Sequence, residues 1–269
     1  MHEMRGWDDL KNRLDADRRC FAFFHPRMPD EPLIFVQVAL LNGLAESIDE
    51  LLDPSSPTSE VGKADTAIFY SISNAQSGLE GISFGGFLIK RVVDLLRAEF
   101  PALRQFATLS PMPGFRKWFE ESLGNGELNI TPSEMAGLLS ASEEKALKAD
   151  GYQSFLMSVL SCKEWYLDEA NEPAVRLILM RAASKYLACC KRKDGIRALD
   201  PVANFHLTNG ARIERLNWLA DKSENGMKNA AGLMVNYLYD LERIEANHEA
   251  YSIDGKTALS PGIKRLLKS

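Results

Sequence analysis

The stretch from residue 66 to residue 109 constrains the fold of this 269-residue chain more than any other. Residues 66–73 are rich in β-branched and aromatic side chains and predict a strand. A turn that holds four glycines follows, and residues 87–96 then place apolar side chains at helical spacing. Pro101 ends that helix, and residues 104–109 predict a second strand. A strand, a glycine-bearing turn, a helix and a strand in this order are typical of α/β proteins.

The segments before this unit add two more strands. Residues 21–24 and 33–41 are apolar and predict strands, and a loop with three prolines separates them. The minor elements of this part are a polar helix at about 7–14, an amphipathic segment at 48–52 and a surface loop at 53–63.

The second half of the chain is expected to be mostly helical before it returns to mixed patterns. Residues 114–192 are typical of helices, with one helix start at 131–134 and a longer helix that opens at Pro173. Residues 210–218 favour a strand, and residues 228–241 fit a helix or a strand equally well. Since no repeat or clear linker interrupts the chain, we expect one α/β (α+β) domain over 1–269, with a helical insertion at about 114–192.

Composition excludes several classes of function. The formal net charge of −5 argues against general affinity for nucleic acid or for an anionic membrane. No apolar run reaches the roughly 20 residues that span a bilayer, and no signal peptide opens the chain, so a cytoplasmic location is expected. The four histidines and four cysteines lack metal-ligand or redox spacing, which predicts that the protein has no metal site.

The glycine-bearing turn is the first candidate binding site. Glycines let the backbone approach a ligand closely, and a helix N-terminus presents unpaired N–H groups with partial positive charge. Such a turn can hold a phosphate or pyrophosphate, and Lys90 and Arg91 lie one turn further along the helix. The glycine spacing matches neither a Walker motif nor a dinucleotide fingerprint. Taken alone, a turn that only links strand to helix is the simpler interpretation.

Two further segments carry candidate catalytic side chains. Ser110 follows the second strand of the unit and begins the stiff sequence Ser-Pro-Met-Pro-Gly, but no Gly-x-Ser-x-Gly motif surrounds it. His206 precedes the turn signal Asn209-Gly210, and histidine suits proton transfer near neutral pH. By themselves, a serine that caps a turn and a histidine with a structural role are the commoner interpretations.

In series, these segments resemble the malonyl-CoA decarboxylases. The resemblance covers the strand, turn and helix at 69–93, the serine segment at 109–115 and the histidine segment at 204–211, and then 215–221 and 232–239, all in the family's order. It implies an acetyltransferase-like (GNAT) α/β fold and conversion of malonyl-CoA to acetyl-CoA and CO2. It also implies that no cofactor is needed, because the thioester itself accepts the electrons.

The resemblance assigns roles to particular residues. Ser110 and His206 are the expected catalytic pair and touch the substrate, with the histidine supplying the proton that replaces CO2. Tyr239 is a secondary candidate, and Asn209, Asn217 or backbone N–H groups are candidate donors to the enolate oxygen. The CoA pyrophosphate is expected on the turn, with Lys90 and Arg91 as secondary candidates; the turn comprises Glu80, Gly81, Ile82, Ser83, Phe84, Gly85 and Gly86.

The chain departs from the family pattern at two points. It begins almost where the family's catalytic domain begins, without the N-terminal helical domain that is linked to oligomerisation, so homo-oligomer formation is left open. Ser83 stands where some members carry a carboxylate, which puts a catalytic role at that position in doubt.

Two alternatives to decarboxylation stay open. One is a CoA-dependent N-acyltransferase of the same fold, which would release free CoA only when an amine is supplied. The other is a non-catalytic acyl-CoA-binding protein.

Overall fold

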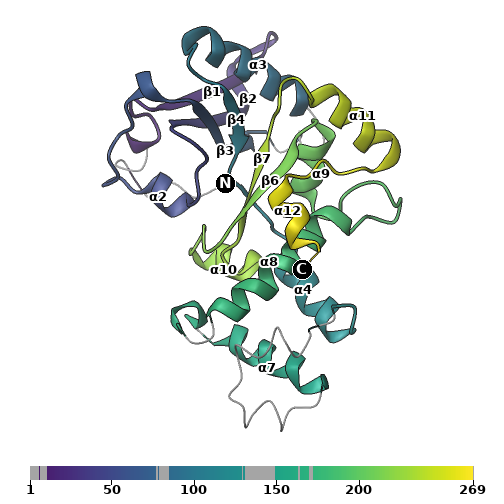
Figure 1. The fold of residues 1–269 in the computed structure, drawn as a ribbon. Helices are drawn as coiled ribbons and strands as arrows, with labels where there is room; N and C mark the ends of the chain where they lie inside the picture. The colour runs from purple at the N-terminus through teal and green to yellow at the C-terminus, as the bar shows by residue number, and fades with distance from the viewer. Residues whose placement is uncertain are drawn as a thin grey trace.

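The computed structural model describes residues 6, 11–76, 78, 85–128, 130, 149–162, 164–169 and 172–268. Within this part of the chain, seven strands form one mixed sheet, with neighbours in the order β1-β2-β3-β4-β7-β5 and β6 paired to β7. Helices cover the sheet and also form a separate group beyond one end of β6 and β7 (Figure 1). The expected α/β class is confirmed.

The N-terminal strands form an antiparallel hairpin, β1 (Arg18–His25) and β2 (Met28–Leu41). The prediction of a loop with three prolines between these strands is wrong, because Pro29 and Pro32 lie inside β2 and only a tight turn separates the two strands. The reason is that β3 pairs with β2 only from Ile34 onward. The prolines therefore lie where β2 has a partner on one side alone, and a missing N–H does not interrupt the sheet.

The two strands and the helix of the unit at 66–109 form as predicted, while most of the turn between β3 and α3 lies outside the described residues. Strand β3 (Thr66–Asn74) leads to α3 (Gly85–Glu99), and β4 (Gln105–Thr108) then pairs in parallel with β3. The short strand β5 (Ser110–Pro111) follows at once. Before this unit, α2 (Ile48–Leu52) confirms the expected amphipathic segment, and a single 3-10 turn, η1 (Val61–Lys63), lies in the expected loop.

Helices account for the described parts of 114–192, as the sequence predicts. They are α4 (Phe115–Gly124), α7 (Ala149–Ser161), the 3-10 turn η3 (Trp165–Leu167) and α8 (Glu172–Cys189). Figure 1 shows α4, α7 and α8 together at one end of the molecule. The helix start expected at 131–134 lies outside the described residues, as does most of the helix expected at 7–14.

The last third of the chain completes the sheet and covers it. Its elements are α9 (Pro201–Thr208), β6 (Arg212–Asn217), α10 (Glu224–Ala230), β7 (Met234–Leu238), α11 (Ile244–Asp254) and α12 (Pro261–Leu266). The strand expected at 210–218 is confirmed. The ambiguous stretch 228–241 holds the end of α10 and all of β7, and Ala231 and Gly232, both with positive φ, turn the chain between them.

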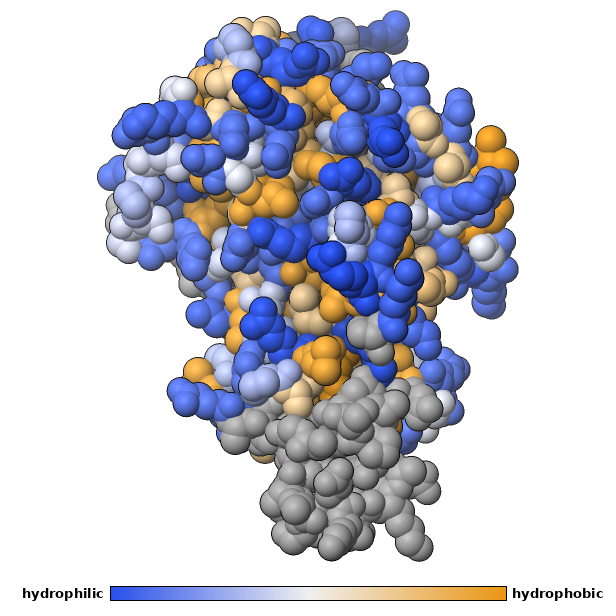
Figure 2. Space-filling view, in the orientation of Figure 1, coloured by the Kyte–Doolittle hydropathy of each residue, from blue (hydrophilic) through white to orange (hydrophobic). Residues whose placement is uncertain are grey.

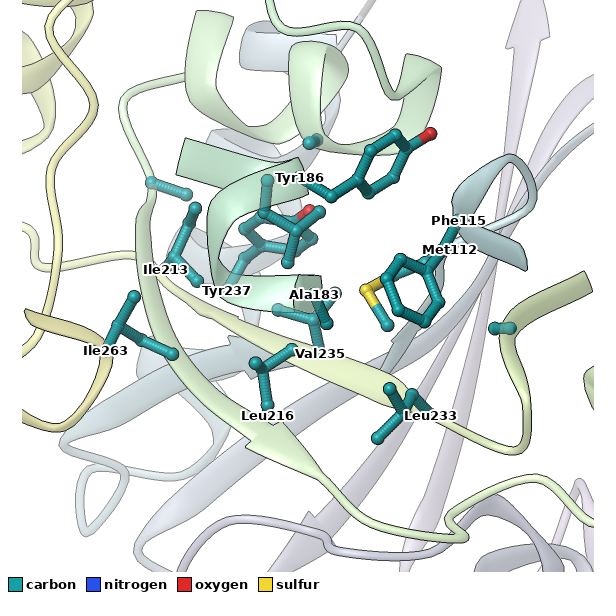
Figure 3. Packing of buried hydrophobic residues seen from close by; sticks show 14 of the residues in the cluster. Met112, Phe115, Ala183, Tyr186, Ile213, Leu216, Leu233, Val235, Tyr237 and Ile263 are labelled. Carbon is teal, nitrogen blue, oxygen red and sulfur yellow. The ribbon is translucent and has the colours of Figure 1, made fainter. Parts of the chain in front are cut away.

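One hydrophobic cluster runs from the sheet into the helical group. It joins residues of β2, β3, α3, α4, α8, β6 and β7, and Figure 3 shows Phe115, Tyr186 and Tyr237 packed within it. The face seen in Figure 2 is mainly hydrophilic, with apolar side chains in small areas between the polar ones. Among the described helices, none combines the length and the apolar character needed to span a membrane.

Candidate active site

Ser110 lies where the chain leaves β4 and crosses to β5. Strands β3 and β4 pair as far as Phe69 and Thr108, after which β3 continues beside β2 alone. The backbone of Ser110 pairs instead with Val235 of β7. At this change of partner the serine is buried within the sheet, with 5% of its surface exposed.

His206 is carried by α9, an element that the sequence analysis did not predict. The side chain of Asp200 accepts hydrogen bonds from the backbone N–H groups of Val202 and Ala203, and Pro201 occupies the first helical turn. An aspartate followed by proline is a recognised helix start, and this signal was present in the sequence. His206 therefore lies in the last turn of a short helix rather than in a turn.

The structure brings the two predicted catalytic residues together. His206 Nε2 lies 3.1 Å from Ser110 Oγ, although 96 positions separate them in the sequence. The Ser110 hydroxyl donates to Thr108 Oγ1 at 2.8 Å. On the other side of the ring, His206 Nδ1 lies 2.7 Å from the hydroxyl of Tyr239. A continuous hydrogen-bonded chain thus runs from Tyr239 through His206 and Ser110 to Thr108.

The chemistry of the partners fixes the proton positions in this chain. Burial raises the pKa of Tyr239 well above its usual value, so this phenol keeps its proton. Because the Ser110 hydroxyl donates to Thr108, its oxygen accepts from His206 Nε2, which leaves Nδ1 to accept from the Tyr239 hydroxyl. The imidazole then carries its own proton on Nε2 and directs it towards Ser110. In the resting site, His206 is therefore a donor to Ser110 and not the acceptor of its proton.

Burial also keeps His206 neutral. The histidine is 3% exposed, and desolvation lowers the pKa of its imidazole to about 3. Its Nδ1 faces a phenol rather than the carboxylate that stabilises imidazolium in serine hydrolases. Because a neutral N–H donor cannot take the hydroxyl proton, Ser110 is not activated as a nucleophile in this arrangement.

Aromatic rings hold the imidazole in place. The ring of Tyr237 stacks on His206 with centroids 4.5 Å apart, and Phe205 meets it edge-on at 5.0 Å. A ring held by stacking on one face and by hydrogen bonds at both nitrogens has little freedom to rotate. The geometry is suited to a group that must donate a proton in one direction.

The structure describes only some of the candidate residues on the glycine-bearing turn. Glu80, Gly81, Ile82, Ser83 and Phe84 lie outside the described residues, while Gly85 and Gly86 begin α3. Lys90 and Arg91 are exposed on the second turn of that helix. Helix α3 contacts α9, so the helix that begins at the turn packs against the helix that carries His206.

The two candidate enolate donors already have partners. The side-chain amide of Asn209 donates to the carbonyl of Phe205 in its own helix, and that of Asn217 donates to Asn236. Neither amide reaches the serine or the histidine through a hydrogen bond in the described residues, so this role stays a prediction. Within the same residues, no group of three acidic, histidine or cysteine side chains could hold a metal ion.

The sequence analysis missed the residues that support the pair. Thr108 accepts from Ser110, and fully buried Asn236 donates to the carbonyl of Thr108 at 2.8 Å. Thr108 stands two positions before a predicted site residue, which was a usable signal. Nothing local marks Asn236, because its partners come from β4, β6 and the loop before α2.

The chain was compared with known protein families and with individual proteins. A family model described as the malonyl-CoA decarboxylase C-terminal domain matches residues 1–269. Mitochondrial malonyl-CoA decarboxylase from Anser anser anser is 40% identical over 253 residues, which cover 93% of this chain and 50% of the relative. The Rattus norvegicus protein of the same name is 41% identical over 258 residues, covering 93% and 51%. The chain therefore spans about half the length of these relatives.

Solved structures give the same answer. Malonyl-CoA decarboxylase from Agrobacterium vitis has a TM-score of 0.86 and 46% identity, over 98% of this chain and 61% of that structure. The Rhodopseudomonas palustris protein has a TM-score of 0.83 and 44% identity, over 99% and 57%. The fold described above is thus shared along nearly the whole chain.

Proposed function

We propose that this chain, which belongs to the malonyl-CoA decarboxylase family and matches its C-terminal domain, converts malonyl-CoA to acetyl-CoA and CO2. The observation that carries the proposal is the buried chain of hydrogen bonds from Tyr239 through His206 to Ser110. The proposal concerns the chain as it stands, which spans about half the length of its relatives.

For this reaction the protein has to position the malonyl group and supply one proton. Loss of CO2 leaves an enolate, whose charge the thioester oxygen accepts, so the reaction needs no cofactor. The bond to the departing carboxylate must lie perpendicular to the thioester plane, and a fixed donor must hold the group there. Ser110 is placed for this task, because its hydroxyl can turn from Thr108 to the malonyl carboxylate.

His206 supplies the proton that the carbon acquires. The overall reaction consumes one proton, and the resting imidazole is neutral because burial lowers its pKa to about 3. A malonyl carboxylate bound beside Nε2 favours imidazolium, so His206 takes up a proton from solvent on Nδ1 as the substrate binds, and the Tyr239 hydroxyl turns to accept from this N–H. When CO2 leaves, the imidazolium donates its Nε2 proton to the α-carbon and becomes neutral, and exchange with solvent then restores the Nε2–H tautomer.

The same geometry disfavours the two alternatives. An N-acyltransferase needs a base for its amine, whereas His206 presents an N–H towards the site, and the Tyr239 hydroxyl occupies the other nitrogen. A protein that only bound acyl-CoA would have no need for a buried histidine with both nitrogens hydrogen-bonded.

CoA binding is assigned to the start of α3. Gly85 and Gly86 open this helix, whose first N–H groups favour an anion, and the exposed Lys90 and Arg91 add positive charge nearby. Because α3 packs on α9, a pyrophosphate held there would place the acyl end of the substrate towards His206. The cytoplasmic location stays a prediction, since the animal relatives are mitochondrial enzymes. Assembly into homo-oligomers also stays a prediction.

The test is incubation of the purified chain with malonyl-CoA alone, with acetyl-CoA measured by chromatography. We expect turnover in the wild-type chain and a fall of kcat by about 10²–10⁴-fold in His206→Asn and Ser110→Ala, the range lost with a general acid or base. His25→Asn, at an exposed position in the hairpin, is the matched control and should retain full activity. Near-normal turnover in His206→Asn, or release of free CoA only with an amine present, would contradict the proposal.

A further inference from the structure

Asp200 is a buried carboxylate that the reaction described above does not use. Its side chain is fully shielded from solvent. One oxygen, Oδ1, accepts from the backbone N–H groups of Val202 at 2.9 Å and Ala203 at 2.8 Å. These bonds begin α9, the helix whose last turn carries His206.

The second oxygen reaches other parts of the fold. Asp200 Oδ2 accepts from the hydroxyl of Tyr186 on α8 at 3.1 Å. The backbone N–H of Gly114, the residue before α4, favours the charged form of this carboxyl and acts to lower its pKa. Gly114 packs so closely here that a Cβ at its position would lie 2.6 Å from the Tyr186 hydroxyl oxygen. The carboxylate of Asp200 thus joins α9 to α8, and through the Tyr186 hydroxyl it contacts the residue that precedes α4.

Gly114 also ends the segment that begins with Ser110. The segment reads Ser-Pro-Met-Pro-Gly, and its two prolines fix φ at alternate positions, so little freedom separates the serine from Gly114. Met112 within it is fully buried (Figure 3). One oxygen of Asp200 therefore begins the helix that carries His206, and the other binds Tyr186, whose hydroxyl packs against the end of the rigid segment that carries Ser110.

Capping alone does not account for this residue. Serine or asparagine begins a helix about as well as aspartate and brings no buried charge. In the described part of the chain, no salt bridge involves Asp200. Burial raises the pKa of this carboxyl above its usual value, against the effect of its donors. What aspartate adds over serine is a second oxygen that accepts from Tyr186, whose hydroxyl packs against Gly114.

We infer that Asp200 is a positioning residue that sets the separation of Ser110 Oγ and His206 Nε2 by tying the serine segment to the histidine helix. The effect on turnover rests on the proposed function, but the effect on the geometry of the pair does not.

Asp200→Ser separates capping from bridging. Serine keeps the bonds to the N–H groups of α9, but it is too short to hold the Tyr186 hydroxyl at the same time. We expect kcat to fall by about 10–100-fold, the size of loss that a displacement of about 1 Å causes, with KM for malonyl-CoA within about twofold. Asp200→Asn keeps the length and one acceptor oxygen and should recover part of the loss. Tyr186→Phe removes one donor to the carboxylate and should lower kcat by a smaller factor.

Ser260→Ala is the matched control. Ser260 is also buried and also begins a helix, because its hydroxyl accepts from Ile263 in α12. Its removal should lower the thermal midpoint and leave kcat unchanged, which is the result expected of a cap with no positioning role.

A readout independent of activity completes the test. Nitrogen-15 NMR of histidine-labelled protein reports the ring nitrogens of four histidines, among them His206. Asp200→Ser and Tyr186→Phe should shift the Nε2 signal of His206, while Ser260→Ala should not. A folded Asp200→Ser with unchanged kcat and His206 signals would overturn the inference. If Asp200→Ser does not fold, unchanged kcat and signals in Tyr186→Phe overturn it. If the wild type has no decarboxylase activity, the proposed function fails and the NMR shifts still decide the inference.

Discussion

A single hydroxyl determines which chemistry His206 can perform. With the phenol of Tyr239 donating to Nδ1, the imidazole proton lies on Nε2 and points at Ser110. A carboxylate at Nδ1 would instead make Nε2 a base and Ser110 a nucleophile. In the proposed reaction, the partner of one ring nitrogen therefore decides whether His206 gives a proton to carbon or activates Ser110 as a nucleophile.

Tyr239→Phe tests this assignment. The change removes the donor to Nδ1 and leaves the ring in place, so the Nε2–H tautomer loses its preference. We expect kcat to fall by roughly tenfold or more, within the range of general acid catalysis, while KM stays nearly constant. Nitrogen-15 NMR should show a mixture of tautomers at His206. A pure Nε2–H tautomer in the variant would contradict the role given to the tyrosine.

The buried imidazole also makes stability depend on pH. In the unfolded chain a histidine binds its proton near pH 6.5, whereas burial lowers the pKa of folded His206 to about 3. Between these values the unfolded state binds more protons, so this contribution to stability is complete above pH 6.5 and is lost as the pH falls.

Urea unfolding at pH 6.5, 5.5 and 4.5 measures this contribution. The wild type should lose about 1.4 kcal/mol per pH unit more than His206→Gln, the value for one proton. His25→Gln, at an exposed position, should follow the wild type. Equal slopes in the wild type and His206→Gln would show that the imidazole is not buried in neutral form.

At the residue scale, the sequence predicts the pair but not its supports. Ser110 and His206 stand in segments whose residues resemble those of a known family, and the structure places them in contact. The positions of Thr108, Tyr237 and Asp200 around them depend on contacts between distant segments. The sequence offered only indirect signals, namely the place of Thr108 two positions before Ser110 and the helix start at Asp200-Pro201, and neither signal reveals a contact with the pair.

At the scale of elements, the predictions are confirmed where the hydrophobic pattern extends over a whole element. They are wrong where contacts between distant segments determine the secondary structure. The strands and helix of the unit at 66–109 form as expected, since each has a clear period. The loop with three prolines is instead part of β2, because proline is tolerated in a stretch of strand with a partner on one side only. Residues 228–241 were ambiguous because they hold parts of both a helix and a strand.

Asn236 on β7 replaces backbone pairing at the point where the sheet changes partner. Strand β7 pairs with β4 at Ala107 and with β5 at Ser110. Between these pairs, the carbonyl of Thr108 accepts from the side chain of Asn236, which also donates to the carbonyl of Ala45. The amide of Asn236 thus keeps β4, β7 and the loop before α2 together beneath the site.

Asn236→Leu should therefore weaken the fold. The change leaves the buried carbonyl of Thr108 without its side-chain donor and the buried amide of Asn217 without its acceptor, at about 1–3 kcal/mol for each unsatisfied group. We expect the free energy of unfolding, measured with urea, to fall by about 3 kcal/mol. Asn209→Ala removes an amide that bonds only within its own helix end and should cost less than about 1 kcal/mol. Equal losses in the two variants would rule out a special role for Asn236.

At the scale of the molecule, the helical group and the sheet share one core. One cluster of buried residues joins Phe115 on α4 and Tyr186 on α8 to Tyr237 on β7. The rings of Trp165 in η3 and Trp218 beyond β6 meet edge-on at 5.8 Å. The sequence predicts a single domain with a helical insertion at about 114–192, and a shared core predicts in turn that both parts unfold together.

Phe115→Ala tests that prediction. Loss of a buried phenylalanine costs about 3–5 kcal/mol, and here the loss falls on the cluster that joins the two parts. Tryptophan fluorescence reports the helical group through two of the four tryptophans, Trp118 and Trp165, while far-UV circular dichroism reports the whole fold. Both signals should show one transition with the same midpoint in the wild type, and both midpoints should move together in the variant. A fluorescence transition that moves alone would show that the helical group unfolds as a unit of its own, in which case the insertion is better described as a second domain.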